Sequence, residues 1–282
     1  MIKMTDILSQ AFDLPSYVIN AGLSAIFLGI VAGIIGSFIV LRKMALMGDA
    51  LSHAVLPGVA ISYIFGINML FGASLFGILA AILIQYISKK SNIKSDTAIG
   101  IILSSFFALG IILISRARSG IDLNHVLFGN ILAVPNSELE QSFWVMIAVI
   151  VIVTLFYKEL LISSFDPVVS KAFGLNTDFY HYLLMLMLSV VTVSSLSQVG
   201  IVLVIAMLVI PAATAYLWTN KLTHMILLAS TIGASMGLLG TYISFHHNLP
   251  TSSAIVLLGS LVFLISFFIS PKNNFFRKEK VS

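Results

Sequence analysis

Long runs of apolar residues are the feature that most constrains how this chain folds. Nine such runs dominate the sequence, and most are long enough to cross about 30 Å of hydrocarbon as a helix that rises about 1.5 Å per residue. Only 9% of the residues are charged, whereas soluble domains carry about 25%, so lipid must be the solvent for much of the surface. The runs cover residues 17–41, 50–65, 69–87, 97–115, 143–157, 179–196, 201–218, 222–245 and 252–269.

These runs predict an all-α, polytopic membrane bundle. They are too long for barrel strands and do not alternate in polarity. We expect about nine transmembrane helices in a single domain that spans residues 1–282, with eight spans as the alternative. The second and fifth runs are short and are expected to be broken or partly re-entrant. Pro57-Gly58 and Pro211 are expected to interrupt the second and seventh helices.

The distribution of lysine and arginine predicts an outside N-terminus and a cytoplasmic C-terminus. In that orientation the outer segments carry only Lys3, Arg116 and Arg118, and basic residues gather in the inner loops, as the positive-inside rule requires. This pattern indicates the orientation of the chain in the membrane and not a nucleic-acid-binding surface. The inner basic residues are Arg42, Lys43, Lys89, Lys90, Lys94, Lys158, Lys171, Lys221, Lys272, Arg277, Lys278 and Lys280.

Two glycine faces predict close helix packing. Gly29 and Gly33 are spaced as GxxxG in the first run, and Gly233 and Gly237 repeat that spacing in the eighth. Small residues at this spacing let helix backbones approach each other. Packing within one bundle is the simpler interpretation, in preference to a dedicated dimer motif.

Asp49 and His53 are the candidate metal ligands. Four residues apart on a helix, they share one face. A carboxylate with an imidazole suits a divalent ion such as Mn²⁺, Fe²⁺ or Zn²⁺, and ionisable groups at membrane depth usually line a polar pathway. The competing interpretation is that Asp49 caps the second helix and that His53 is a buried side chain whose hydrogen bonds are all made. The Pro57-Gly58 pair that follows favours the ion site, because broken helices at membrane depth commonly frame ion sites.

Two protein ligands are too few for Mn²⁺, which takes about six donors. Water, or Asp49 and His53 of a second copy of the chain, would supply the rest. In the predicted outer loop, Asp122 and His125 are candidates for receiving an ion, although solvated loop polarity explains them as well.

The predicted cytoplasmic connection, residues 158–178, contains the pattern of a short amphipathic helix. Asp166 and Pro167 suit an N-cap and a first helical residue, and Gly174 suits the end. Its apolar side is expected to serve either as an interfacial anchor or as a knob that docks a cytoplasmic partner. That side is formed by Val168, Val169, Ala172 and Phe173.

Missing motifs also narrow the function. The sequence has no GxxxxGK[ST], so it has no P-loop for ATP hydrolysis, and it has no HExxH. Cysteine is absent, which excludes thiolate metal sites and disulfides. Active pumping would therefore need energy from a separate subunit.

The sequence resembles the membrane permeases of bacterial manganese, zinc and iron ABC importers. The matching blocks are residues 41–60, 94–100, 125–132 and 206–215, and the most specific is the Gly48-Asp49-x-x-x-His53 block. The resemblance implies a permease homodimer in the bacterial plasma membrane, a cytoplasmic ABC ATPase that alone binds ATP, and an extracellular metal-binding lipoprotein. It implies that Asp49 and His53 are metal ligands, that residues 166–174 couple to the ATPase, and that no cofactor is permanently bound. The blocks look closest to manganese-type members.

The leading hypothesis is thus the permease subunit of an ATP-driven importer of a divalent metal, Mn²⁺ first, with Zn²⁺ and Fe²⁺ as alternatives. The second is a channel or secondary carrier that needs no ATPase, although such carriers usually show more intramembrane acids and an internal repeat. The third, an intramembrane metalloenzyme, would need three or more ligands from one chain. The ligand types alone do not identify the ion.

Overall fold

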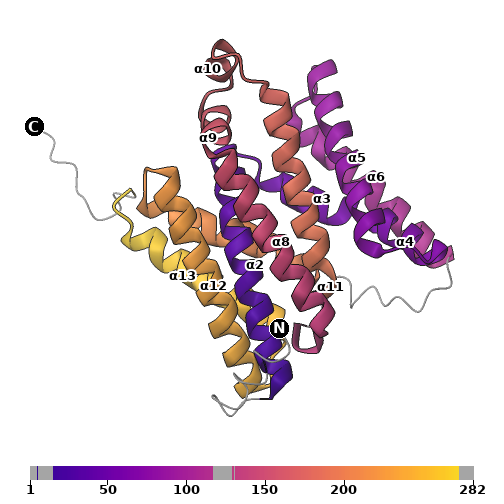
Figure 1. Cartoon of the computed structure of the whole chain (residues 1–282), viewed down its shortest axis with the longest axis vertical. Helices are drawn as coiled ribbons and strands as arrows, with labels where there is room; N and C mark the ends of the chain where they lie inside the picture. Colours follow the sequence, from indigo (N-terminus) through magenta and orange to yellow (C-terminus); the bar gives the residue numbers. More distant parts are fainter. Residues whose placement is uncertain (1–4, 6–14, 117–128, 130, 273–282) are drawn as a thin grey trace, which may run out of the picture.

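The chain forms a bundle of helices in this computed structural model, which describes residues 5, 15–116, 129 and 131–272 (Figure 1). These residues contain no β-strand, and nine of their helical spans are long and apolar enough to cross a membrane. The all-α bundle and the count of nine are confirmed, and the eight-span alternative is wrong. The elements are α2 (Ser16–Leu41), α3 (Ala45–Ala54), α4 (Leu56–Phe65), α5 (Met69–Lys90), α6 (Ser95–Arg116), η1 (Ile131–Ala133), α8 (Asn136–Leu155), α9 (Tyr157–Phe165), α10 (Pro167–Ala172), α11 (Thr177–Trp218), α12 (Leu222–His247) and α13 (Thr251–Ile269).

The second span is divided at Val55, between α3 and α4. Pro57 has no N–H to donate, so it interrupts the regular helical ladder just before its own position. Val55 keeps right-handed helical angles (φ −76°, ψ −17°), and the two pieces together form one span, Ala45–Phe65. The fifth span, α8, was expected to be broken or partly re-entrant, but it is one continuous helix. It is longer than the apolar run because it also includes the mostly polar residues 136–142, which the search for apolar runs left out.

The sixth and seventh spans, Thr177–Leu196 and Gln198–Trp218, meet at a break in α11. The break lies at Gly200 (φ 75°, ψ 166°) and not at Pro211, which lies inside helical backbone. Glycine adopts a positive φ at little cost. Pro211, like Pro57, has no N–H to donate, but its fixed φ is compatible with a helix and the backbone around it stays helical. Gly129 (φ 61°) packs directly on the backbone of this break, with no room there for a side chain.

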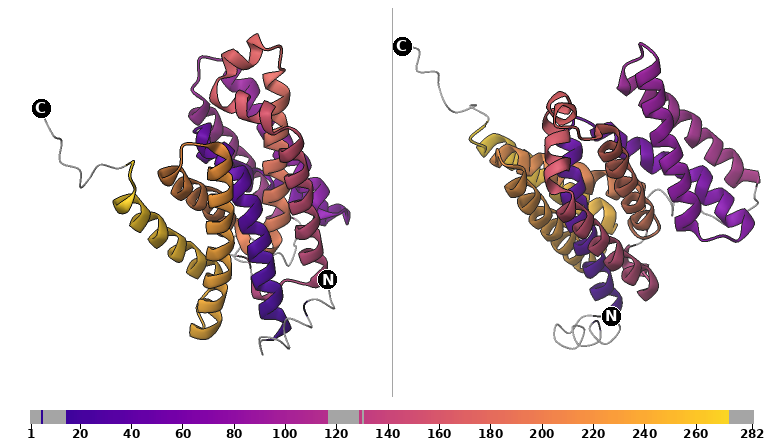
Figure 2. Two further views of the ribbon diagram at one scale, coloured as in Figure 1. Left: turned by 60° about the vertical axis from the view of Figure 1, so that its left-hand side comes forward. Right: turned by 45° about the horizontal axis from the view of Figure 1, so that its top comes forward.

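The two glycine faces pack against each other, which confirms the expected seam within one bundle. Helices α2 and α12 run side by side along their length (Figure 2). A methyl group on Gly29 would overlap the backbone of Gly233, and one on Gly33 would lie 2.5 Å from the nitrogen of Ser230. Ser230 Oγ also donates to the carbonyl of Ile30 across the seam, at 3.2 Å. Two helix backbones are therefore in direct contact.

Loops that the basic residues mark as inner come together at one end of the bundle. Arg42, after α2, donates to hydroxyls of α9, and Lys89, near the end of α5, pairs with Asp178 at the start of α11. Helices α9 and α10 form this end of the molecule, at the top of Figure 1. Their shared position agrees with the predicted grouping of these loops, while the direction of the termini across a membrane stays a prediction.

The glycine seam generates a stability prediction. Replacing Gly29 with alanine should destabilise the protein by about 1–3 kcal/mol, because the added methyl must push α2 and α12 apart. The measurement is the thermal unfolding midpoint of the protein purified in detergent. Gly100→Ala is the matched control, since nothing lies within 4 Å of a methyl group there. Equal midpoints for both variants would contradict the seam.

Candidate functional site

Asp49 and His53 lie on one face of α3, and their side chains meet. The distance from His53 Nε2 to Asp49 Oδ1 is 3.4 Å, with the His53 side chain 20% exposed and that of Asp49 37% exposed. The edge of the His53 ring stands against Phe107 of α6, with ring centroids 5.0 Å apart. An acid and an imidazole thus sit together in a partly sheltered position between α3 and α6.

The cap interpretation of Asp49 is wrong. Helix α3 begins at Ala45, with Met44 in the N-cap position, so Asp49 is about one turn inside the helix. The early start follows from how α2 ends: Lys43 adopts a left-handed φ of 57°, and the N–H groups of Lys43 and Met44 bond the carbonyls of Val40 and Ile39. This arrangement is a Schellman motif, which terminates a helix and turns the chain.

His53 is not a fully satisfied buried donor either. Its Nδ1 is buried without a hydrogen-bond partner among the described residues, while Nε2 faces Asp49. Buried polar atoms are normally paired, and His53 Nδ1 is one of eight buried side-chain nitrogen and oxygen atoms without a partner among the described residues. The pair therefore presents a carboxylate and an incompletely satisfied imidazole.

The pair can contribute two donors to a divalent cation. No group of three or more histidine, cysteine or acidic side chains able to hold a metal occurs within the part of the chain that the structure describes. One protomer therefore offers an incomplete coordination sphere for Mn²⁺. Asp122 and His125, the predicted outer receiving residues, lie outside the described residues.

The short helix expected after Asp166 is present as α10. The Asp166 carboxylate accepts hydrogen bonds from the backbone N–H groups of Val168 (2.9 Å) and Val169 (3.0 Å), as an N-cap should. Gly174 ends the turn with a φ of 75°. The predicted cytoplasmic connection holds a further helix, α9, which the sequence pattern did not reveal because its polar and apolar residues are mixed.

The apolar side chains of α10 point away from the bundle. Val168 is 77% exposed and Phe173 is 74% exposed, and Val169 and Ala172 are exposed as well. Ser170, in contrast, is fully buried against the rest of the chain. Helix α10 is thus anchored on one side and displays apolar side chains on the other.

Sequence reasoning missed a polar cluster around Arg42. Its guanidinium donates to Ser163 Oγ and Ser164 Oγ of α9, both at 2.9 Å, and lies 3.4 Å from His181 Nδ1 of α11. Burial lowers the pKa of Arg42 to about 10, which leaves the group charged at neutral pH. His181 belongs to this cluster through its ring nitrogen, and no pattern in the sequence pointed to it.

A second polar cluster is centred on Gln198, which is almost fully buried beside the α11 break. Its amide donates to Ser142 Oγ (2.6 Å) and to the carbonyl of Glu138 (3.2 Å), and its oxygen accepts from Ser24. Every polar atom of this side chain is bonded, so the cluster ties α2, α8 and α11 together.

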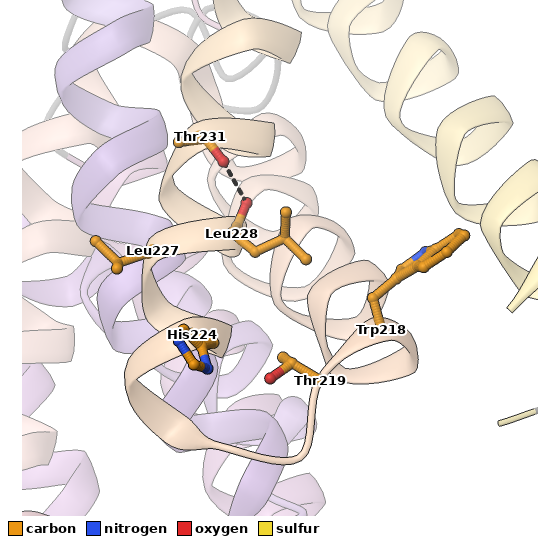
Figure 3. A pocket seen from close by; sticks show the side chains of 6 residues that line it. All are labelled: Trp218, Thr219, His224, Leu227, Leu228 and Thr231. Atoms are coloured by element: carbon orange, nitrogen blue, oxygen red, sulfur yellow. Dashed lines mark hydrogen bonds between the residues drawn. The ribbon is translucent and has the colours of Figure 1, made fainter. Parts of the chain in front are cut away.

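A wide pocket of about 480 Å³ opens between the end of α11 and α12 (Figure 3). Trp218 and Thr219 line it from α11 and the following turn, and His224, Leu227, Leu228 and Thr231 line it from α12. It contains none of the sequence-predicted site residues, and His224 is its single possible metal ligand. The pocket therefore adds nothing to the Asp49–His53 site.

Comparison with known proteins gives matches over almost the whole chain. The family model described as the ABC 3 transport family matches residues 15–270. The manganese transport system membrane protein MntC of Listeria monocytogenes is 56% identical over 265 residues, which is 94% of this chain and 95% of that protein. The manganese import system permease protein ScaB of Streptococcus gordonii is 54% identical over 260 residues, 92% of this chain and 94% of that protein.

A solved structure has the same fold. It is PsaBC from Streptococcus pneumoniae in complex with Fab, and one of its chains matches with a TM-score of 0.86 and 51% sequence identity. The match covers 98% of this chain and 98% of that chain. The fold is therefore shared with that chain.

The geometry of the pair generates a binding prediction. Asp49→Asn keeps the size of the side chain but removes its charge, so the affinity of the purified protein for Mn²⁺ should fall at least about ten-fold, the effect of losing one strong interaction with a charged group. Electron paramagnetic resonance of free Mn²⁺ measures the bound fraction. Glu140→Gln removes an exposed carboxylate from α8 and should bind as the unsubstituted protein does; equal loss in both variants would point to general charge effects.

Proposed function

The chain belongs to the ABC 3 transport family, and we propose that it carries Mn²⁺ into the cytoplasm as the permease of an ATP-driven importer. It is a multi-pass protein of the plasma membrane and has no ATPase of its own. The observation that carries the proposal is the Asp49–His53 pair on α3, a carboxylate 3.4 Å from an imidazole inside a membrane-spanning segment. The family resemblance expected from the Gly48-Asp49-x-x-x-His53 block is confirmed.

The two donors of one protomer suit transport better than storage. A divalent cation that reaches the pair exchanges part of its water shell for Asp49 Oδ1 and the His53 imidazole. Two protein ligands hold it weakly enough for release, since Mn²⁺ prefers about six donors. We place the remaining donors on water or on Asp49 and His53 of a second copy, in a permease homodimer with the ion path at or beside the interface.

The relatives point to manganese among the divalent metals. Oxygen and nitrogen donors accept Fe²⁺ and Zn²⁺ as well, and the intrinsic affinity order favours zinc over manganese. The Listeria and Streptococcus relatives, named for manganese transport or import, cover more than nine-tenths of the chain. Selectivity for Mn²⁺ would then come from the delivering protein and from the geometry of the pathway.

A partner must supply the energy, because the chain has no P-loop. We assign ATP hydrolysis to a cytoplasmic ABC ATPase that docks on α10, where Val168 and Phe173 project outward. An extracellular metal-binding protein would deliver the ion at the opposite end, where we keep Asp122 and His125 as candidate receiving residues. Family membership favours this scheme over a channel or secondary carrier that works alone.

Metal uptake tests the proposal directly. Cells that produce this chain with its ATPase and binding protein should accumulate manganese, measured by elemental analysis, and Asp49→Ala should abolish the accumulation while expression and dimer formation persist. In a parallel assay with radiolabelled Mn²⁺, excess Zn²⁺ or Fe²⁺ should reduce uptake of the label less than excess unlabelled Mn²⁺ does. Normal uptake by Asp49→Ala would remove the pair from the pathway.

Docking at α10 is tested by co-purification of the ATPase. Phe173→Asp or Val168→Asp places a charge on the exposed apolar side and should reduce the amount of recovered ATPase several-fold, since buried apolar anchors dominate such interfaces. Leu249→Asp is the control, because Leu249 is also exposed but follows α12 at the predicted outer side. Undiminished recovery with both α10 variants would exclude this docking surface.

A further inference from the structure

Arg42 connects three parts of the molecule that are far apart in the sequence. It is the C-cap residue of α2, and its guanidinium bonds Ser163 and Ser164 in the last turn of α9 and approaches His181 in the first turns of α11. Ser163 is buried and Ser164 partly buried, so these bonds are sheltered from water. The planar guanidinium is suited to such a fork because its donors point in fixed directions.

On one side, Arg42 is joined by a short rigid turn to the helix that carries the metal pair. The Schellman turn at Lys43 and Met44 follows Arg42 directly, and α3 starts at Ala45. Asp49 is about one helical turn into α3. A displacement of Arg42 is therefore passed on to Asp49 through the hydrogen-bonded turn at Lys43 and Met44 and the first turn of α3.

On the other side, the partners of Arg42 lie next to the docking helix. Helix α9 ends at Phe165, and Asp166, which caps α10, separates the two helices. Ser163 and Ser164 are thus within a few residues of the Asp166 cap. Helix α10 packs against α9, so movement of α10 acts directly on the helix that carries these serines.

The hydrogen bonds of the Arg42 guanidinium suit a contact that breaks and re-forms during transport better than a permanent one. Within the described residues Arg42 has no carboxylate partner; its neighbours are two hydroxyls and an imidazole. Bonds to neutral acceptors are weaker than carboxylate pairs. Changing partners therefore costs less than breaking a buried ion pair would.

We propose that Arg42 is a positioning residue that couples movement of the α9–α10 segment to the Asp49–His53 pair. The inference rests on the proposed function, because it assumes that α10 receives the force of the ATPase. Arg42 touches neither the metal nor ATP in this scheme. Arg42 determines the position of α3 that accompanies each position of α9.

The test is the ratio of Mn²⁺ transported to ATP hydrolysed by the complete complex, with its binding protein, in proteoliposomes. Arg42→Gln should lower this ratio about ten-fold, the effect of losing one hydrogen bond to a charged group, while the ATPase still co-purifies. The ratio is informative because misfolding removes transport and hydrolysis together and leaves it unchanged.

Three further variants make the result specific. Lys90→Gln removes the same charge from an exposed residue at the end of α5, outside this path, and should keep the ratio of the unsubstituted complex. Arg42→Lys keeps the charge but loses the fork, so an intermediate ratio is expected. The double variant Ser163→Ala/Ser164→Ala leaves Arg42 in place, removes its hydroxyl partners and should lower the ratio in the same direction.

The outcomes separate the two proposals. If the unsubstituted complex transports Mn²⁺ but Arg42→Gln and the double serine variant keep its ratio, the coupling role of Arg42 is overturned. Should Arg42→Gln fail to fold, the double serine variant decides alone. If the unsubstituted complex hydrolyses ATP without moving Mn²⁺, the proposed function fails instead.

Discussion

Close contact between helix backbones is the interaction on which this bundle depends. In hydrocarbon the hydrophobic effect gives helices little reason to associate, so packing and interhelical hydrogen bonds must hold them together. Helices α2 and α12 meet where Gly29, Gly33 and Gly233 leave no side chains between them. Helix α2 then carries Arg42 at its end and sets the position from which α3, with Asp49 and His53, begins.

The polar groups inside the bundle differ in how well they are satisfied. Gln198 has partners for its amide nitrogen and its oxygen, which fits a structural tie between helices. Asp49 and His53 remain partly exposed, and His53 Nδ1 has no partner among the described residues. The polar atoms of Gln198 are thus engaged in holding helices together, whereas the side chains of Asp49 and His53 stay partly accessible.

The features that could be predicted from the sequence are those set by residues close together in the chain. The spans follow from apolar length, and the cap of α10 follows from Asp166 and Pro167, because each rests on neighbouring residues. The Arg42 fork could not be predicted, since Ser163 is 121 residues away in the chain. The α11 break was assigned to Pro211 instead of Gly200 because a glycine in an apolar run looks the same whether it packs or bends, and no pattern showed what Gly129 would contact.

The outward-facing apolar side chains of α10 have a consequence for how the protein is made. Val168 and Phe173 are the kind of surface that chaperones and proteases recognise on incomplete assemblies. With the docking proposed for α10, a copy synthesised without its ATPase would display both residues until it was captured or degraded. Balanced production of the two subunits would therefore be enforced by quality control, through one short helix.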